Sequence, residues 1–299
     1  MKLVIYQVDS FTTTIFEGNP AGVVLNADEL TDPQMQKIAR ELNNSETAFI
    51  INRPGPGYDI EVRFFTPTRE VPICGHATIA AHYVYAREHG MTEGVIRQKT
   101  KAGILPVEIV SEDNERRIVM TQAGISFGKI LEGKDRDTLV EGLGVNALDL
   151  EADLPVQIVS TGHSKVMVPI NNKDVLDSIN IDASLLARLS AEIGCNGFYA
   201  FTFDSREPGI LVSGRMFAPA IGIAEDPVTG NANGPLGAYL THYGKLGKSA
   251  LGCSFVIKQG EAIKRKGYMT VQVFSDDKGP TLVKISGNAC IAFKTAIEL

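Results

Sequence analysis

Hydrophobic and polar residues alternate with the period of a β-strand through much of the first half of the chain. The alternation predicts strands at Lys2–Val8, Pro20–Leu25, Ser45–Ile51, Asp59–Phe65, Ile104–Ile109 and Arg117–Thr121, the last two around a turn at Asp113–Asn114. Two helices are expected among them: one opens at Asp32-Pro33, with Asp32 as its capping residue, and ends near Asn43, and the other runs from Gly75 to a stop at Gly90. The first half is therefore expected to be a curved, largely antiparallel sheet around one helix.

The second half repeats this mixture of many strands and few helices. Helical spacing predicts a short helix at Asp135–Gly142 and longer ones at Asp182–Ile193 and Gly230–Tyr243. Strands are predicted at Val156–Thr161, Lys165–Pro169, Gly197–Phe203, Ser254–Lys258, Met269–Phe274 and Thr281–Ser286. The predicted fold class is α+β.

One sequence pattern occurs twice. The stretches 63–83 and 214–240 read RFFTPTREVPICGHATIAAHY and GRMFAPAIGIAEDPVTGNANGPLGAYL, and in both an Arg-x-Phe-x-Pro segment leads through a loop to Gly-polar-Ala and an apolar helix. Copies so far apart indicate a duplicated domain instead of a short-period repeat. A chain of 299 residues also suits two domains, which we expect at 1–125 and 126–299, allowing for the last strand to return to the N-terminal domain.

Composition narrows the classes of function. Apolar residues make up 44% of the chain and charged residues 21%, as in an ordinary globular protein, and the net charge of −6 without a long Lys/Arg run disfavours nucleic-acid binding. No apolar run reaches membrane-spanning length and no signal peptide is evident, so we expect a cytoplasmic protein with a small-molecule partner. The four cysteines are scattered, which indicates neither a zinc site nor a disulfide framework.

The two echoed helix starts are candidate anion sites. Gly75 and Gly230 each begin a helix, where backbone N–H groups lack internal acceptors and the helix dipole favours negative charge. If the halves face each other, both helix starts would converge on one cleft and could hold a carboxylate without a metal ion. The alternative is that these glycines only permit tight turns and close helix-sheet packing.

Three side chains near these helices could take part in proton transfer. Glu46 enters a buried strand, where partial desolvation would favour its protonated form, as a general acid/base requires. His76, in the first helical turn, should stay neutral and donate or accept hydrogen bonds. Asp226, held extended by Pro227, could accept hydrogen bonds from a ligand's amine or hydroxyl group. Each has a plain structural alternative: an edge-of-strand glutamate, a surface or capping histidine, and a capping aspartate.

Cys74, immediately before Gly75, could be a thiolate base under the helix dipole. A racemase with a base on each face of a carbon would need a second thiol before Gly230, and that position holds Thr229. Cys74 is therefore interpreted as a packing residue.

The ordered motifs resemble those of the PhzF family of phenazine-biosynthesis isomerases, which shares its fold with diaminopimelate epimerase. The similarity spans nearly the whole chain and rests on SETAF at 45–49, VPICGHAT at 71–78, RMFAP at 215–219 and EDPVTGNA at 225–232. The resemblance implies two similar domains, each a barrel-like, mostly antiparallel sheet around a central helix, with the active site in the interdomain cleft. It also implies a homodimer.

The resemblance further implies cofactor-independent isomerisation of a small cyclic substrate with amino and carboxylate groups, such as trans-2,3-dihydro-3-hydroxyanthranilate. Glu46, His76 and Asp226 would be catalytic, and the substrate would bind at Gly75, His76, Gly230 and Asn231, with no cofactor and no metal ion. Asn231 replaces the family's common serine, and of the usual Gly-Arg-Pro-Ser only Arg265 survives, so substrate identity transfers less well than chemistry.

Two other functions stay open on the same fold. The first is an amino-acid racemase or epimerase, which the pairing of Cys74 with Thr229 disfavours. The second is a small-molecule-binding protein without turnover, which the presence of all three candidate proton-transfer residues disfavours.

Overall fold

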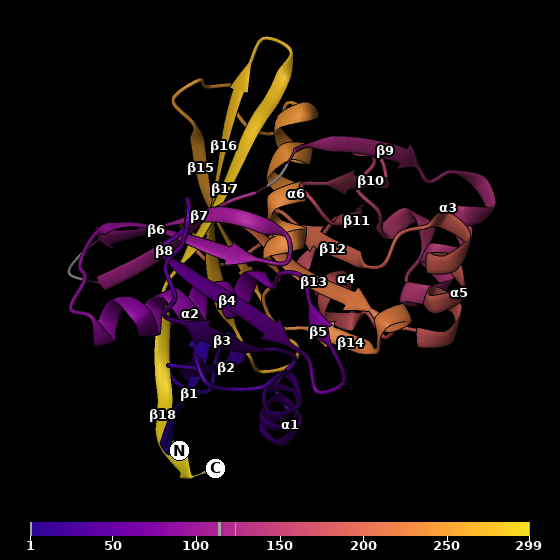
Figure 1. Cartoon of the computed structure of the whole chain (residues 1–299). Helices are drawn as coiled ribbons and strands as arrows, with labels where there is room; N and C mark the ends of the chain where they lie inside the picture. Colours follow the sequence, from indigo (N-terminus) through magenta and orange to yellow (C-terminus); the bar gives the residue numbers. More distant parts are fainter. Residues whose placement is uncertain (1, 113–114, 123, 299) are drawn as a thin grey trace. The chain divides into compact units, whose positions relative to one another are not determined.

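The computed structural model describes residues 2–112, 115–122 and 124–298 and divides the chain into two compact units (Figure 1). Unit 1 consists of Met1–Thr121 together with Ser286–Leu299, and unit 2 consists of Gln122–Ile285. The turn expected at Asp113–Asn114 lies outside the described residues. Among the described helices, none has both the length and the apolar character needed to cross a membrane.

Unit 1 wraps a mostly antiparallel sheet around one buried helix. Its helices are α1 (Asp32–Leu42) and α2 (Gly75–Glu88), and its strands are β1 (Lys2–Ser10), β2 (Asn19–Leu25), β3 (Thr47–Ile51), β4 (Ile60–Phe65), β5 (Glu70–Val71), β6 (Gly94–Thr100), β7 (Gly103–Glu112), β8 (Glu115–Thr121) and β18 (Ala289–Glu298). The helix α2 packs against strands from both ends of this series, among them β1, β2, β3, β7, β8 and β18. Since residues 76–82 of α2 are all buried, the helix has no solvent-facing stripe at its start and is the centre of the unit.

Unit 2 has the same plan with additional helices. Its helices are α3 (Gly133–Leu143), α4 (Lys173–Ser178), α5 (Ala183–Ile193) and α6 (Gly230–His242), with short 3-10 turns at Ala147–Asp149 and Pro219–Ile221. Its strands are β9 (Ser126–Ile130), β10 (Gln157–Ser160), β11 (Ser164–Pro169), β12 (Phe198–Thr202), β13 (Ile210–Ala218), β14 (Ile223–Asp226), β15 (Cys253–Gln259), β16 (Gly267–Asp276) and β17 (Gly279–Gly287). The helix α6 is the buried counterpart of α2 and packs on β10, β11 and β16.

Strand pairing reproduces the duplication predicted from the repeated motif. In unit 1, β1–β2 and β3–β4 are antiparallel whereas β2–β3 and β4–β6 are parallel. In unit 2, β10–β11 and β12–β13 are antiparallel whereas β11–β12 and β13–β15 are parallel. Each central helix follows the short strand that pairs with the fourth strand of its series, β5 on β4 and β14 on β13. The units are therefore two copies of one topology.

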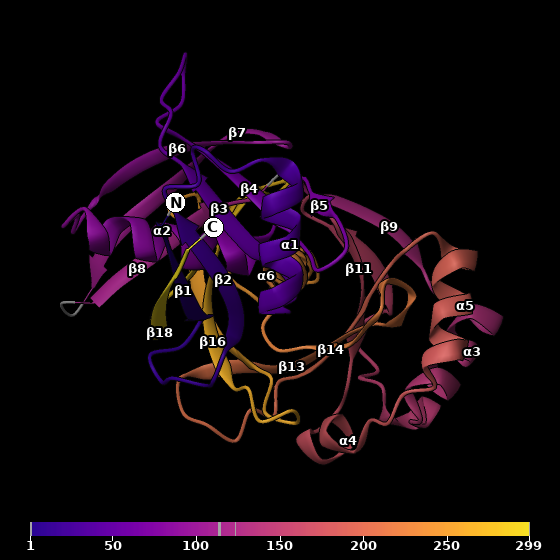
Figure 2. The same ribbon diagram turned by 60° about the horizontal axis from the view of Figure 1, so that its bottom comes forward.

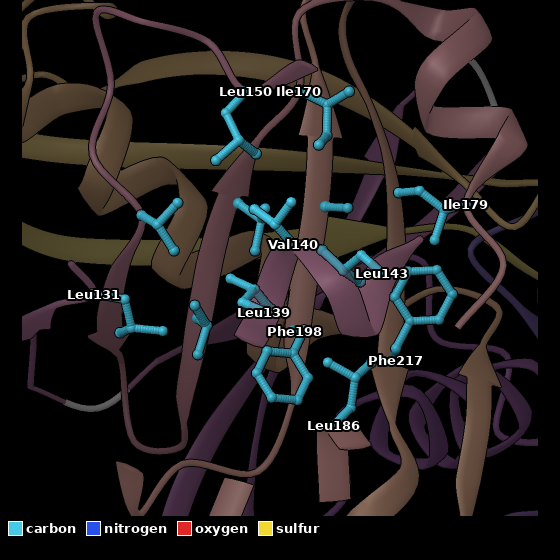
Figure 3. Packing of buried hydrophobic residues seen from close by; sticks show 14 of the residues in the cluster. Leu131, Leu139, Val140, Leu143, Leu150, Ile170, Ile179, Leu186, Phe198 and Phe217 are labelled. Atoms are coloured by element: carbon cyan, nitrogen blue, oxygen red, sulfur yellow. The ribbon is translucent and has the colours of Figure 1, made fainter. Parts of the chain in front are cut away.

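One apolar cluster of unit 2 lies between its helices and one face of its sheet. Figure 3 shows Leu139, Val140 and Leu143 of α3 and Leu186 of α5 meeting Phe198 of β12 and Phe217 of β13. The helices α3 and α5 lie side by side over this face, as Figure 2 shows. The helix α6 packs on the opposite face of the sheet. Its start therefore lies next to Asp226, the candidate carboxylate of this unit.

Most predicted elements are present, with differences at one helix cap and in several elements that were not predicted. The helix α1 is capped at Thr31 and not at Asp32, which lies in its first turn. The sequence predictions lacked α4 and the strands β5, β6, β9, β13, β14 and β18. Of these, β13 has no clean alternation of apolar and polar residues, and β18 carries exposed residues along its second half. The strand β18 pairs antiparallel with β1 from Lys2–Glu298 to Ser10–Ala289, with a register shift between Gln7 and Val8, so β18 completes unit 1.

Candidate functional site

Glu46 and His76 lie together in unit 1, at the start of α2. The Nε2 atom of His76 is 3.5 Å from Oε2 of Glu46 and 3.2 Å from Oγ of Ser45. Glu46 immediately precedes β3, all five residues of which are buried, and its side chain keeps 18% of its accessible surface. The carboxylate is therefore largely removed from water yet still reachable, which suits a group that exchanges a proton with a ligand.

His76 is held both through its ring and through its backbone. Its Nδ1 lies 3.4 Å from Sγ of Cys74, and the hydroxyl of Ser10 donates to its backbone carbonyl at 2.8 Å. When the thiol donates to Nδ1, the ring proton is on Nε2 and points to the carboxylate of Glu46. Cys74 thus does more than fill space: it orients the imidazole. The sequence did not single out Ser45 or Ser10 because a lone serine in a strand or loop carries no spacing signal.

The same three residues, Glu46, Cys74 and His76, have potential metal-ligand atoms within 4.8 Å of one another. The thiol lies beside Nδ1 and the carboxylate beside Nε2, on different edges of the imidazole. One metal ion bonds to one ring nitrogen, so this arrangement fits a hydrogen-bonded series better than a shared ion. The expectation of a metal-free site stays a prediction.

Asp226 ends β14 in unit 2, and the hydroxyl of Thr229 donates a short hydrogen bond to its Oδ2. Thr229 occupies the capping position of α6, so Asp226 is not the capping residue that the alternative interpretation required. Thr229 stands where a racemase would need a second catalytic thiol. Its hydroxyl instead donates a hydrogen bond to Asp226.

A buried amide fixes the loop between β14 and α6. The Nε2 of Gln259 donates to the Asp226 carbonyl at 2.9 Å and to the Thr229 hydroxyl at 3.2 Å, while its Oε1 accepts from the Thr229 N–H at 3.1 Å. Asn233 continues the network: it donates to Oε1 of Gln259 at 2.9 Å and accepts from the Tyr199 hydroxyl at 2.6 Å. Burial of Tyr199 raises the pKa of its phenol, which keeps it a hydrogen-bond donor. Such satisfied buried networks rigidify the groups they hold.

The two helix-start glycines differ in their surroundings. A Cβ built on Gly75 meets no atom within 4 Å, whereas one on Gly230 would lie 2.6 Å from Cδ1 of Ile285. Close packing therefore explains the glycine at position 230, in line with the alternative that these glycines only permit tight turns and close helix-sheet packing. It does not explain the glycine at position 75. Open space at the first residue of α2 is what an approaching ligand needs.

The structure thus assembles the predicted residues as two groups. Glu46, Gly75 and His76 lie together in unit 1, and Asp226, Gly230 and Asn231 lie at the start of α6 in unit 2. In each group a carboxylate accompanies a helix N-terminus.

Comparison with known proteins identifies the family. Residues 8–295 match the PhzC-PhzF family, described as phenazine biosynthesis-like protein. A Clostridium acetobutylicum protein named an uncharacterized isomerase is 53% identical over 298 residues, covering 100% of this chain and 99% of the relative. A trans-2,3-dihydro-3-hydroxyanthranilate isomerase of Pseudomonas fluorescens is 30% identical over 284 residues, covering 94% of each.

A solved structure shows the same fold. The phenazine biosynthesis protein of the PhzF family from Bacillus anthracis has a TM-score of 0.90 and 32% identity, with 100% of both chains covered. The expected fold class, α+β with a mostly antiparallel sheet and few helices, is confirmed. The relatives named isomerases support the expectation of an isomerase. With a match along nearly its whole length, the chain belongs to the PhzC-PhzF family of phenazine biosynthesis-like proteins.

Proposed function

We propose that this protein is a cofactor-independent isomerase that moves a proton within a small cyclic substrate carrying amino and carboxylate groups. The observation that carries the proposal is the Glu46–His76 pair at the start of α2, in which a partly desolvated carboxylate faces an oriented imidazole. The match to a family with members named isomerases supports it.

In the proposed reaction, Glu46 removes a proton from one carbon, and the C–H electron pair enters the conjugated system of the substrate. The protonated Glu46 then returns the proton to another carbon on the same face, so that substrate and product have the same composition. His76, with its proton on Nε2, stabilises the ionised form of Glu46 before and after the transfer.

The remaining candidate residues would bind the substrate. Asp226 accepts hydrogen bonds from the amino group, and the first backbone N–H groups of the helices, at Gly75, His76, Gly230 and Asn231, favour its anionic groups. The Thr229 hydroxyl and the amide of Gln259 hold Asp226 and the adjoining backbone in place for this contact.

The test is isotope transfer with trans-2,3-dihydro-3-hydroxyanthranilate in deuterated water, followed by mass spectrometry. The wild-type protein should form an isomer, with solvent deuterium at carbon to the extent that the proton on Glu46 exchanges with water before its return, and Glu46→Gln should slow formation of the isomer by about 10²- to 10⁴-fold, the usual contribution of a general base. Glu93→Gln, which removes an exposed carboxylate, is the matched control. Full turnover by Glu46→Gln would remove Glu46 from the mechanism.

Two finer assignments also belong to this proposal. Turnover of that compound would support a part in phenazine biosynthesis, whereas turnover of another cyclic amino acid alone would assign the protein to a different route. We further propose a cytoplasmic homodimer, which light scattering of the purified protein tests through a mass twice that of one chain.

A further inference from the structure

Lys165 shares a sheet face with Asp226. Residues paired across β11, β12, β13 and β14 present their side chains to the same side, and the register aligns Met167 with Tyr199, Tyr199 with Met216, and Met216 with Asp226. Lys165 is two residues before Met167 on β11 and so lies on this face as well. The alternate residues of β11, Val166 and Val168, belong to the apolar cluster on the other face.

This face is the one that α6 covers. Tyr199 bonds to Asn233 of α6, and Asp226 bonds to Thr229 at the cap of α6. The helix also packs directly on β11. Lys165 therefore projects to the side of the sheet that carries the candidate substrate-binding residues of unit 2.

The stem of Lys165 lies in a cradle that only glycine permits. A Cβ on Gly197 would come within 2.6 Å of Cδ of Lys165 and within 2.4 Å of Cε of Met216, and Gly197 has a backbone φ of +131°. Any other residue at 197 would both strain the backbone and displace the lysine. The half-buried side chain is thus guided along the strand surface instead of extending into solvent.

The ammonium group of Lys165 lies within electrostatic range of Asp226. Burial lowers the pKa of Lys165, and the charges of Cys195 and then Asp226 oppose that effect. Burial, and after it the charge of Lys165, also lowers the pKa of His163 on the preceding turn. Within the described part of the chain the ammonium donates one hydrogen bond, to the carbonyl of Ser164 at 3.1 Å. An ammonium has three donors, so this one retains capacity for a ligand.

We propose that Lys165 binds the carboxylate of the substrate, so that unit 2 recognises a zwitterion with Asp226 at the amino group and Lys165 at the anion. This inference rests on the proposed function and adds the residue that selects for an anionic substrate. A partly buried cation is costly to keep unless a ligand's opposite charge completes its surroundings. The helix start alone is a weaker and less selective anion site.

The test compares two probes that differ only by the carboxylate, 3-hydroxyanthranilate and 2-aminophenol, by titration calorimetry. Wild-type protein should bind 3-hydroxyanthranilate at least about tenfold tighter, because only this probe offers a carboxylate to the charged donor. Lys165→Met, which keeps the stem and removes the charge, should bring the two affinities together, and Lys165→Arg should keep most of the difference. Lys37→Met removes an exposed lysine and should leave the difference unchanged.

Two results would overturn the inference: a wild-type protein without preference for the carboxylate probe, or a Lys165→Met protein that keeps the preference. Should Lys165→Met fail to fold, NMR of the wild type provides the test. The ε-methylene signal of Lys165 is assigned by its absence from the spectrum of Lys165→Arg and is followed during titration with each probe. That signal must shift with 3-hydroxyanthranilate and not with 2-aminophenol, and the reverse or equal shifts count against the inference.

Binding and turnover separate this inference from the proposed function. A preference that disappears in Lys165→Met while the wild type forms no isomer would keep the anion site and refute the isomerase. Isomer formation by the wild type, together with a preference that Lys165→Met retains, would support the isomerase and refute the anion site.

Discussion

The guanidinium of Arg215 holds both carboxylate oxygens of Glu225, with Nε donating to Oε1 at 3.0 Å and Nη2 donating to Oε2 at 2.7 Å. Its Nη1 donates to the carbonyls of Leu176 and Ile179 at 3.0 and 2.9 Å. Glu225 directly precedes Asp226, so this buried pair fixes the strand that presents the candidate substrate-binding carboxylate.

Unit 1 contains the same device. Arg63 donates to both oxygens of Glu70 at 2.8 Å, and each arginine also lies over the phenylalanine two residues further on, at 5.2 Å for Arg63 and 5.0 Å for Arg215. Both glutamates precede the first glycine of their central helix by five residues. The repeated Arg-x-Phe motif is thus a clamp on the loop that enters each central helix.

Removing the clamp should destabilise the protein. Arg215→Met leaves the Glu225 carboxylate, whose side chain is 8% exposed, without its charge partner, and breaking such a buried pair costs about 3–5 kcal/mol in the free energy of unfolding. Arg97→Met breaks an exposed pair with Asp59 and should leave the free energy of unfolding nearly unchanged. Urea denaturation of both variants measures the difference, and equal losses would contradict a special role for the buried clamp.

The two helix-start glycines should respond differently to alanine. Gly75→Ala places its methyl group in open space and should leave the free energy of unfolding nearly unchanged, while reducing the affinity for 3-hydroxyanthranilate by about tenfold or more if ligand approaches there. Gly230→Ala must displace Ile285 and should cost about 1–3 kcal/mol of stability. Calorimetric titration and thermal unfolding of each variant separate the two effects, and unaltered binding by Gly75→Ala would return that glycine to a structural role.

The buried ring of His82 should make stability depend on pH. Burial lowers its pKa to about 4 from 6.5, so in acid the unfolded chain takes up a proton that the folded chain does not. The contribution of neutral His82 to the free energy of unfolding is complete above pH 6.5. It is lost as the pH falls toward 4, by about 3 kcal/mol in all. Urea unfolding of wild type and His82→Leu at several pH values should give curves that diverge over this interval, and parallel curves would contradict the prediction.

The Thr229 hydroxyl should matter for turnover more than its methyl group. Thr229→Val keeps the shape but removes the donor to Asp226 and the acceptor for Gln259, so kcat/KM should fall by about 10- to 100-fold, the equivalent of one hydrogen bond to a charged group. Thr229→Ser retains the hydroxyl and should keep most of the activity. A Val variant as active as the Ser variant would show that Asp226 does not depend on this contact.

Local patterning and the repeated motif were sufficient to predict most of the fold. The starts of α2 and α6 could be read from the glycines that open apolar helices, and α1 from its proline and apolar spacing. The strand β18 could not, because its partner β1 lies at the opposite end of the sequence and pairing over such a distance leaves no local signal.

The candidate site was predictable only in its motif residues. Glu46, His76 and Asp226 stand beside distinctive spacings, but Gln259 reaches Asp226 from another strand, and Lys165 shares a sheet face with Asp226 only through the register of four strands. The positions of Gln259 and Lys165 relative to Asp226 arise only in the tertiary structure. The proposed role of Glu46 itself stays a prediction until turnover is measured.

The antiparallel ladder between β1 and β18 has a consequence for biosynthesis. The ribosome synthesises unit 1 in two parts, residues 1–121 and 286–299, and synthesises unit 2 between them. The second unit can therefore mature while the nascent chain is still attached, whereas the first must wait with the outer edge of β1 uncovered until the final segment emerges. Since Lys2 and Glu298 are paired on this ladder, joining β18 to β1 with a short linker and opening the chain elsewhere should yield a permuted protein in which unit 1 is continuous in sequence.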